Sequence, residues 1–190
     1  MAIGDISMKK SALYVAADAA LCTGCKACEL ACFAEHNRTS NHVGKTVGTA
    51  TIPVTAGLFL VKGEGLCLPI QCKHCEDAPC LQACARHAIA RVNGQIVIHE
   101  ERCIGCKDCI MACPFGAITI APVFAKGEAV TLPGSNLQRR VASKCDLCIG
   151  IEGGPACVRA CPSKALRVVD ADEERTEKIL RAAEALMLQK

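Results

Sequence analysis

The segment RCIGCKDCIMACPFGAI, residues 102–118, contains four cysteines separated by two, two and three residues, with a proline directly after the last. Disulfides are disfavoured inside so tight a loop, because bridged cysteines need a defined Cα separation and facing Cβ vectors. Structural zinc usually takes one C-x2-C pair and a second pair a dozen or more residues away. A cubane [4Fe-4S] cluster fits better, because Cys103, Cys106 and Cys109 can supply three of its corners. In a C-x2-C-x2-C-x3-C-P run the fourth cysteine, here Cys113, ligates a second cluster.

The pattern occurs four times along the chain, and every occurrence ends in C-x3-C. Sixteen of the 17 cysteines belong to these four groups. Groups one to four are Cys22, Cys25, Cys28 and Cys32; Cys72, Cys75, Cys80 and Cys84; Cys103, Cys106, Cys109 and Cys113; and Cys145, Cys148, Cys157 and Cys161. Because the repetition indicates one shared role, we predict all sixteen as iron ligands of four [4Fe-4S] clusters. A zinc-stabilised interaction module is the rival from another class.

The composition agrees with a chain that depends on bound metal. With no tryptophan, one tyrosine and four phenylalanines among 190 residues, a large aromatic core is excluded. Metal binding can supply the missing folding free energy. The formal net charge of +3 would become about −5 once sixteen thiolates and four cluster cores are counted. Together with the absence of a long Lys/Arg run, this argues against a nucleic-acid partner.

The N-terminal part of the chain carries a weak targeting signal. MKKSALYVAADAALC has the basic start and apolar stretch of a signal peptide, but Asp18 interrupts it and Cys22 follows. We therefore expect residues 12–17 to form a strand that leads into the first cysteine loop. The longest uncharged run, 46–61, has 16 residues with Pro53 and four threonines, which is short and polar for a membrane span. A cytoplasmic chain with no direct membrane span is expected.

The segments between the groups predict two ferredoxin-like units. Asn93-Gly94 lies between short β-forming stretches and favours a two-residue hairpin between groups two and three. Loop, short helix, hairpin, loop, short helix and the closing strand AITIAPV would make an inner domain, 66–123. The strands ALYVAAD and ALRVVDA, if paired, would close an outer domain from 12–45 and 138–170. The predicted fold class is α+β, with two bacterial-ferredoxin-like 2[4Fe-4S] domains, one inserted in the other, plus a C-terminal helix, 172–190.

In this arrangement each cluster takes three cysteines from one group and the fourth from the partner group. The predicted ligand sets are Cys22, Cys25 and Cys28 with Cys161; Cys145, Cys148 and Cys157 with Cys32; Cys72, Cys75 and Cys80 with Cys113; and Cys103, Cys106 and Cys109 with Cys84.

Two long connections and the tail remain. The connection 33–65 has a hairpin candidate at Lys62–Gly65, and 119–144 is expected as a loop that is either functional or a simple surface cover. In the tail, Asp172 is the expected helix cap and Lys190 lies at the end. Its apolar stripe is Ile179, Leu180, Ala183, Leu186 and Met187. We expect the stripe to pack on the outer domain, with docking on a partner or another copy as the alternative.

The other candidate residues have weaker signals. Cys67 is expected to be a small buried hydrophobe rather than a ligand or redox thiol. For His74, inside C-K-H-C, a solvated loop histidine is favoured over a hydrogen bond to a sulfur. Lys26, Lys73 and Lys107 either raise cluster potentials or only solvate the surface. The five histidines form no metalloprotease motif and no G-x-G-x-x-G follows a strand, so no catalytic residue is predicted.

With these motifs in hand, the chain resembles the four-cluster electron-transfer subunits of molybdenum or tungsten oxidoreductases, the dimethyl sulfoxide reductase iron–sulfur subunit family. The matching pieces are CKHCEDAPC, RCIGCKDCIMACPFGAI and KCDLCIGIEGGPACVRACPSKAL. Relatives serve formate dehydrogenases, formate hydrogenlyase, carbon monoxide dehydrogenase and tungsten aldehyde oxidoreductases. The resemblance also implies the nested pairing of the two domains.

The function expected from this resemblance is electron transfer without catalysis by the chain itself. The expected partners are a catalytic molybdenum or tungsten subunit, of the aldehyde oxidoreductase or formate dehydrogenase type, and an electron acceptor such as a flavoprotein or hydrogenase. Stacking of copies of the chain on one another is a further expectation. A free polyferredoxin without a fixed partner is the alternative to a bound subunit.

Overall fold

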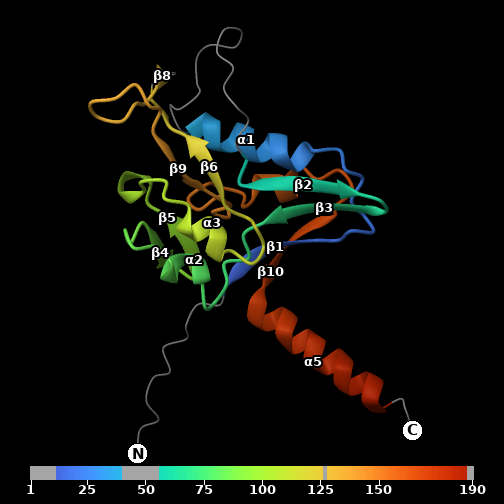
Figure 1. The fold of residues 1–190 in the computed structure, drawn as a ribbon. Helices are drawn as coiled ribbons and strands as arrows, with labels where there is room; N and C mark the ends of the chain where they lie inside the picture. The colour runs from blue at the N-terminus through green and yellow to red at the C-terminus, as the bar shows by residue number, and fades with distance from the viewer. Residues whose placement is uncertain (1–11, 40–55, 126–127, 188–190) are drawn as a thin grey trace, which may run out of the picture.

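The computed structural model describes residues 12–39, 56–125 and 128–187 (Figure 1). Residues 46–55 of the long uncharged run, the end of the expected outer segment 12–45, and Lys190 lie outside these ranges.

The first and last strands of the described chain pair with each other. β1 (Leu13–Ala17) runs antiparallel to β10 (Leu166–Asp170), with Val15 opposite Val168. Both strands contain β-branched valines, which suit a pleated surface, and Val15 is completely buried. The predicted pairing of the segments before group one and after group four is confirmed. It brings the two groups that are farthest apart in the sequence to the same part of the molecule.

Two hairpins form where the turn residues predict them. β4 (Ile89–Val92) pairs with β5 (Gln95–Ile98) across Asn93–Gly94, where both residues have positive φ, as a type I′ turn requires. β2 (Leu58–Gly63) pairs with β3 (Leu66–Gln71) in the second hairpin.

The long connection after group three contains the predicted closing strand AITIAPV, which is confirmed as β6 (Thr119–Pro122), and its later part, expected as a loop, also forms strands. β6 pairs with β9 (Arg140–Ser143), and β7 (Phe124–Ala125) pairs with β8 (Glu128–Ala129). The turn residues Pro133–Gly134 allow the chain to reverse its direction between β8 and β9. β9 therefore pairs with a strand of the predicted inner segment, 66–123, although its own residues lie in the predicted outer segment, 138–170.

The third cysteine of every group lies in the first turn of a helix. The helices are α1 (Ala27–Thr39), α2 (Pro79–Gln82), α3 (Asp108–Ala112) and α4 (Ala156–Arg159). A separate 3-10 turn, η1 (Glu100–Arg102), precedes group three. Because one helical turn takes 3.6 residues, C-x3-C places the fourth cysteine about one turn farther on. α1 packs with α4, and α2 packs with α3.

The core consists of two clusters in which cysteines alternate with small aliphatic side chains. The first combines Val15, Leu58, Leu147 and Leu166 with Cys28, Cys32, Cys72, Cys145 and Cys157. The second combines Ala78, Ala88, Ile89, Ile96, Ile118 and Ala142 with Cys80, Cys84 and Cys109. Cysteine side chains thus form a large part of the buried core.

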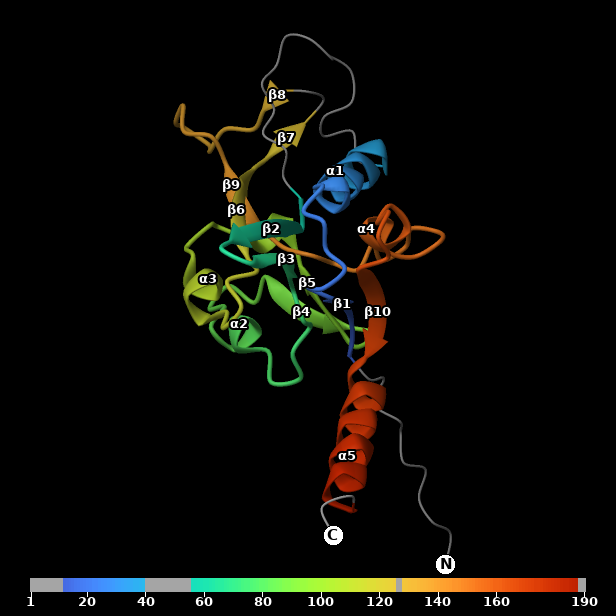
Figure 2. The ribbon, with the colours of Figure 1, turned by 90° about the vertical axis from the view of Figure 1, so that its right-hand side faces the viewer.

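α5 (Ala171–Met187) projects away from the body in both views (Figures 1 and 2). None of its residues is buried. Exposed fractions between 58% and 77% are found for Ile179, Leu180, Leu186 and Met187. The prediction that this stripe packs on the outer domain is therefore wrong. No helix within the described ranges combines the length and apolar character that crossing a lipid bilayer requires.

The cap of α5 also differs from the prediction. Oδ1 of Asp170 accepts the backbone N–H groups of Asp172 at 2.9 Å and Glu173 at 3.3 Å. Asp170 ends β10 and precedes the first helical residue, so its carboxylate is the one that reaches the free N–H groups of the first turn. The prediction of Asp172 as the cap is wrong by two residues, since Asp172 lies inside the helix.

Candidate metal centres

The loops of groups one and three share one backbone conformation. Both read C-x-G-C-K-x-C; φ is 72° at Gly24 and Gly105, 63° at Lys26 and 75° at Lys107. Residues other than glycine rarely adopt positive φ. Two positions with positive φ in each loop allow the backbone to coil tightly. A Cβ atom on Gly105 would lie 2.7 Å from the carbonyl oxygen of Arg140. Glycine therefore allows β9 to lie directly against this loop.

The loops of groups two and four share a different feature, which lies in their C-x2-C pairs. His74 and Leu147 occupy the same place in their C-x2-C pairs, with φ of 49° and 60°. Their backbone N–H groups donate to the Sγ atoms of Cys72 and Cys145, each at 3.4 Å. Groups one and three thus have one kind of loop, and groups two and four have another. Each predicted pair, one with four and two with three, contains one loop of each kind.

Three cavities are each lined by four cysteines, and in every case the fourth comes from a different group. The sets are Cys22, Cys25, Cys28 and Cys161; Cys72, Cys75, Cys80 and Cys113; and Cys103, Cys106, Cys109 and Cys84. These are three of the four sets that the sequence predicts. Four cysteine sulfurs around one cavity are the donor set that a [4Fe-4S] cluster requires, so the residues present fit that group.

The remaining four predicted ligands lie near one another as well. Cys32 belongs to the same buried cluster as Cys145 and Cys157. The helix α1, which carries Cys32, also packs with α4, which carries Cys157. The structure therefore brings α1 of group one to the loop of group four.

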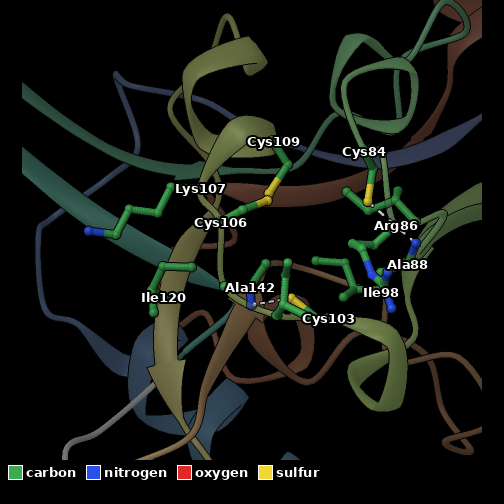
Figure 3. A pocket seen from close by; sticks show the side chains of 13 residues that line it. Cys84, Arg86, Ala88, Ile98, Cys103, Cys106, Lys107, Cys109, Ile120 and Ala142 are labelled. Atoms are coloured by element: carbon green, nitrogen blue, oxygen red, sulfur yellow. Dashed lines mark hydrogen bonds between the residues drawn. The ribbon is translucent and has the colours of Figure 1, made fainter.

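Figure 3 shows the cavity between groups two and three, where the loop of Cys106 and Cys109 faces Cys84. Two sulfurs accept backbone hydrogen bonds at 3.3 Å, from Ala142 N–H to Cys103 and from Ala88 N–H to Cys84. Such donors stabilise negative charge on sulfur and take part in setting cluster potentials. The N–H of Ala142 belongs to β9, so the pairing of β9 with β6 supplies this site with one of its hydrogen-bond donors.

Exposure separates the four loops into two classes. Cys25 and Cys106, which occupy equivalent places in groups one and three, are exposed, whereas every other cysteine is buried or half-buried. Groups one and three therefore lie nearest the surface.

Burial keeps several of these thiols protonated in the absence of metal. It raises the pKa of Cys28 and Cys109 to about 11 and that of Cys157 to about 12. The pKa of Cys145 is raised further by the same cause. Since metals bind the thiolate, loading of these sites must release protons.

His36, which no sequence motif selected, joins groups one and four. Hydrogen bonds to Asp146 and Cys32 raise the pKa of His36 to about 11, so both ring nitrogens donate. Nδ1 donates to the carbonyl oxygen of Cys32 at 2.8 Å, and Nε2 donates to Oδ1 of Asp146 at 3.0 Å. The same Oδ1 accepts the N–H of Cys148 at 2.9 Å. Because 110 positions separate His36 from Asp146, no local spacing could reveal the pair.

His74 is completely buried, so the prediction of a solvated loop histidine is wrong. Its Nδ1 accepts the N–H of Ile96 at 2.9 Å, and burial lowers the pKa of the ring to about 3. The ring is therefore neutral, with its proton on Nε2. Lys144 donates to the carbonyl oxygen of Ile96 and, at 2.8 Å, to that of Cys145. His74 thus lies in a chain of contacts between the loops of groups two and four.

The remaining candidates also have defined places. Lys73 is half-buried; its Nζ lies 4.6 Å from the ring centroid of Tyr14 and 3.3 Å from the carbonyl oxygen of Val15. It therefore joins the group two loop to β1, whereas Lys26 and Lys107 are exposed.

Cys67 is half-buried rather than buried as predicted. Its Sγ lies 3.9 Å from the Sγ of Cys22, and Cys67 does not line any of the three four-cysteine cavities.

Comparison with known proteins identifies the family. Residues 64–171 match a family described as the 4Fe-4S dicluster domain. The chain belongs to this family. The matched segment contains groups two, three and four, and members of a 4Fe-4S dicluster family hold iron–sulfur clusters on such cysteines.

Relatives of this 4Fe-4S dicluster protein cover most of its length. It is 43% identical over 159 residues to an iron-sulfur protein of Rhodospirillum rubrum, covering 81% of this chain and 80% of that one. It is 38% identical over 164 residues to the electron transport protein HydN of Escherichia coli (strain K12), covering 84% and 89%. It is 38% identical over 179 residues to formate hydrogenlyase subunit 2 of the same strain, covering 83% and 81%. The chain is thus a ferredoxin-like iron–sulfur protein of the electron-transport kind.

The crossed arrangement predicts which thiols a single ligand change will release. In Cys113→Ser, the first three cysteines of group two should become open to alkylation by iodoacetamide under anaerobic, non-denaturing conditions. The first three cysteines of group three should stay protected, because Cys113 lines the cavity of group two. Iron should fall by about four atoms per chain, the content of one [4Fe-4S] cluster. Peptide mass spectrometry reads each cysteine separately.

The matched control is Cys84→Ser, for which the pattern should reverse, because Cys84 lines the cavity of group three. Release of the group three cysteines by Cys113→Ser would contradict the crossed arrangement.

The burial of His74 predicts a stability difference between two substitutions. His74→Leu should cost about 1–3 kcal/mol of unfolding free energy, because the buried N–H of Ile96 loses its acceptor. His74→Asn keeps an acceptor oxygen and tolerates positive φ, so its urea midpoint should lie closer to that of the unchanged protein. Circular dichroism of the reconstituted protein measures both, and equal midpoints for the two variants would argue against this role.

Proposed function

We propose that the sixteen grouped cysteines hold four [4Fe-4S] clusters and that the chain is a non-catalytic electron-transfer subunit. The observation that carries this proposal is the set of three cavities, each lined by four cysteines drawn from two groups. A [4Fe-4S] cluster with four cysteine ligands would supply one-electron storage at each site. The protein supplies sulfur ligands, backbone N–H donors to sulfur, and burial that excludes water.

The arrangement of the loops supports a relay with two outer ends and a buried middle. Cys25 and Cys106 are the exposed ligands, so the sites of groups one and three are the places where electrons would enter and leave. The contacts of His74 and Lys144 join the loops of groups two and four in the interior. In the proposed order, sites one, four, two and three follow one another.

The domain division belongs to the same proposal. Segments 12–45 and 138–170 would carry the sites of groups one and four, and 66–123 those of groups two and three. The β1–β10 pairing supports the closure of the outer unit, while β9 packs with the inner one. We place the protein in the cytoplasm because thiols that must stay free until iron binds are preserved in a reducing compartment.

We propose an oxidoreductase complex as the setting. One relative is named formate hydrogenlyase subunit 2 and another hydrogenase-4 component A, which favours a partner of the formate dehydrogenase or hydrogenase type. A catalytic molybdenum or tungsten subunit with a flavoprotein as acceptor, as in the dimethyl sulfoxide reductase iron–sulfur subunit family, is the finer form of this proposal. Aldehyde oxidoreductases are included in it.

A reductive titration tests the proposed electron storage. Anaerobically purified protein should be brown and should take up about four electrons per chain while its visible absorption bleaches. A colourless protein that contains zinc and takes up no electrons would establish the rival interaction module instead. Purification of the tagged chain from its native host tests the complex: a catalytic oxidoreductase subunit should copurify, whereas isolation of the chain alone would favour a free polyferredoxin.

A further inference from the structure

The seventeenth cysteine lies beside the first proposed cluster site without belonging to it. Cys67 is on β3, and its Sγ lies 3.9 Å from the Sγ of Cys22, which lines the cavity with Cys25, Cys28 and Cys161. Cys67 itself does not line that cavity. A fifth thiol therefore lies within contact distance of a sulfur that is proposed to bind iron.

The contact between Cys67 and the first loop depends on a glycine. A Cβ atom on Gly24 would lie 2.7 Å from the Sγ of Cys67 and 2.8 Å from Cε of Lys62. Since real Cβ atoms do not approach other atoms so closely, a larger residue at position 24 would displace either the side chains of Cys67 and Lys62 or the loop itself. The loop backbone thus packs directly on the Cys67 side chain.

Both partners of the contact are held by backbone structure. Cys67 lies opposite Lys62 in the β2–β3 hairpin. The N–H of Cys22 donates to the carbonyl oxygen of Asp18 at 3.2 Å. Two thiols on separately anchored segments therefore face each other, whereas Cys22 and Cys25 lie in one tight loop, where bridging is disfavoured.

We propose that Cys67 is a reserve thiol that joins Cys22 in a disulfide when oxidation removes the cluster from the first site. This inference rests on the proposed function for its first step, the loss of iron. Hydrogen peroxide converts one of the two thiols to a sulfenic acid and releases one water. The second thiol attacks that sulfur, forms the S–S bond and releases a second water. Two thiols thus lose two electrons and two protons to one peroxide.

The bond would protect Cys22 from irreversible damage. A sulfenic acid with no neighbouring thiol is open to further oxidation to sulfinic acid, which common reductants do not reverse. A disulfide is opened again by thiol exchange. Reduction would return Cys22 to the first site, ready for a new cluster. The sulfurs must approach from 3.9 Å to about 2.05 Å, which the loop can allow once no cluster holds Cys22 in place.

Peptide mapping after peroxide treatment tests the bond. Loaded protein is treated anaerobically with one equivalent of hydrogen peroxide per chain and increasing excesses, its free thiols are blocked, and non-reduced peptides are sequenced by fragmentation. We expect the peptides that carry Cys22 and Cys67 to be joined, with fragment ions that assign these two cysteines. Absence of that linkage while Cys22 is oxidised to sulfinic acid would overturn the proposal.

The matched variant is Cys67→Ser, which keeps the size of the side chain and removes the second sulfur. Before peroxide its iron content and visible spectrum should equal those of the unchanged protein. After peroxide, reduction and reconstitution, it should regain several-fold less of the iron lost and carry sulfinic acid at Cys22. Equal recovery of both proteins would overturn the protective role.

The two proposals fail in different ways. If the purified chain binds no iron, the proposed function fails, yet the linkage between Cys22 and Cys67 can still be measured on the iron-free protein. If iron binds fully and no linkage forms, only the inference about Cys67 fails.

Discussion

The convergence of four sulfur atoms from two separate chain segments on one cavity is the constraint on which the rest of the structure depends. No group supplies all four cysteines of the cavity that it lines. Each loop is therefore tied to a second loop, either nearby, as for groups two and three, or across almost the whole chain, as for groups one and four. The β1–β10 pair lies where this requirement brings together the segments before group one and after group four.

The same constraint accounts for the unusual core. A chain with four phenylalanines, one tyrosine and no tryptophan has little bulk with which to fill an interior, and its two buried clusters combine cysteines with small aliphatic residues. Bound metal then contributes folding free energy directly. Burial raises the pKa of three of these thiols to about 11 or 12. Because metal binds the thiolate, loading must release their protons, and folding and loading are expected to be coupled.

The hairpin turns, the cysteine loops and the β1–β10 pairing could be predicted from the sequence, but several long-range side-chain contacts could not. Asn93–Gly94 defines a hairpin because its turn needs positive φ, and cysteine spacing defines each loop. The His36–Asp146 pair, the burial of His74 and the approach of Cys67 to Cys22 depend on segments that meet only in the folded chain. Amphipathic periodicity predicted the helix α5 correctly. Periodicity does not show which surface an apolar stripe packs against, and the stripe of α5 is exposed.

The count of iron and acid-labile sulfide in anaerobically purified or reconstituted protein tests the central claim most directly. Four cubane clusters require about sixteen iron and about sixteen sulfide atoms per chain. Ratios close to these values would support a fully loaded set of sixteen cysteines. About eight of each would mean that only two of the four cysteine sets hold clusters, and zinc without sulfide would contradict the account entirely.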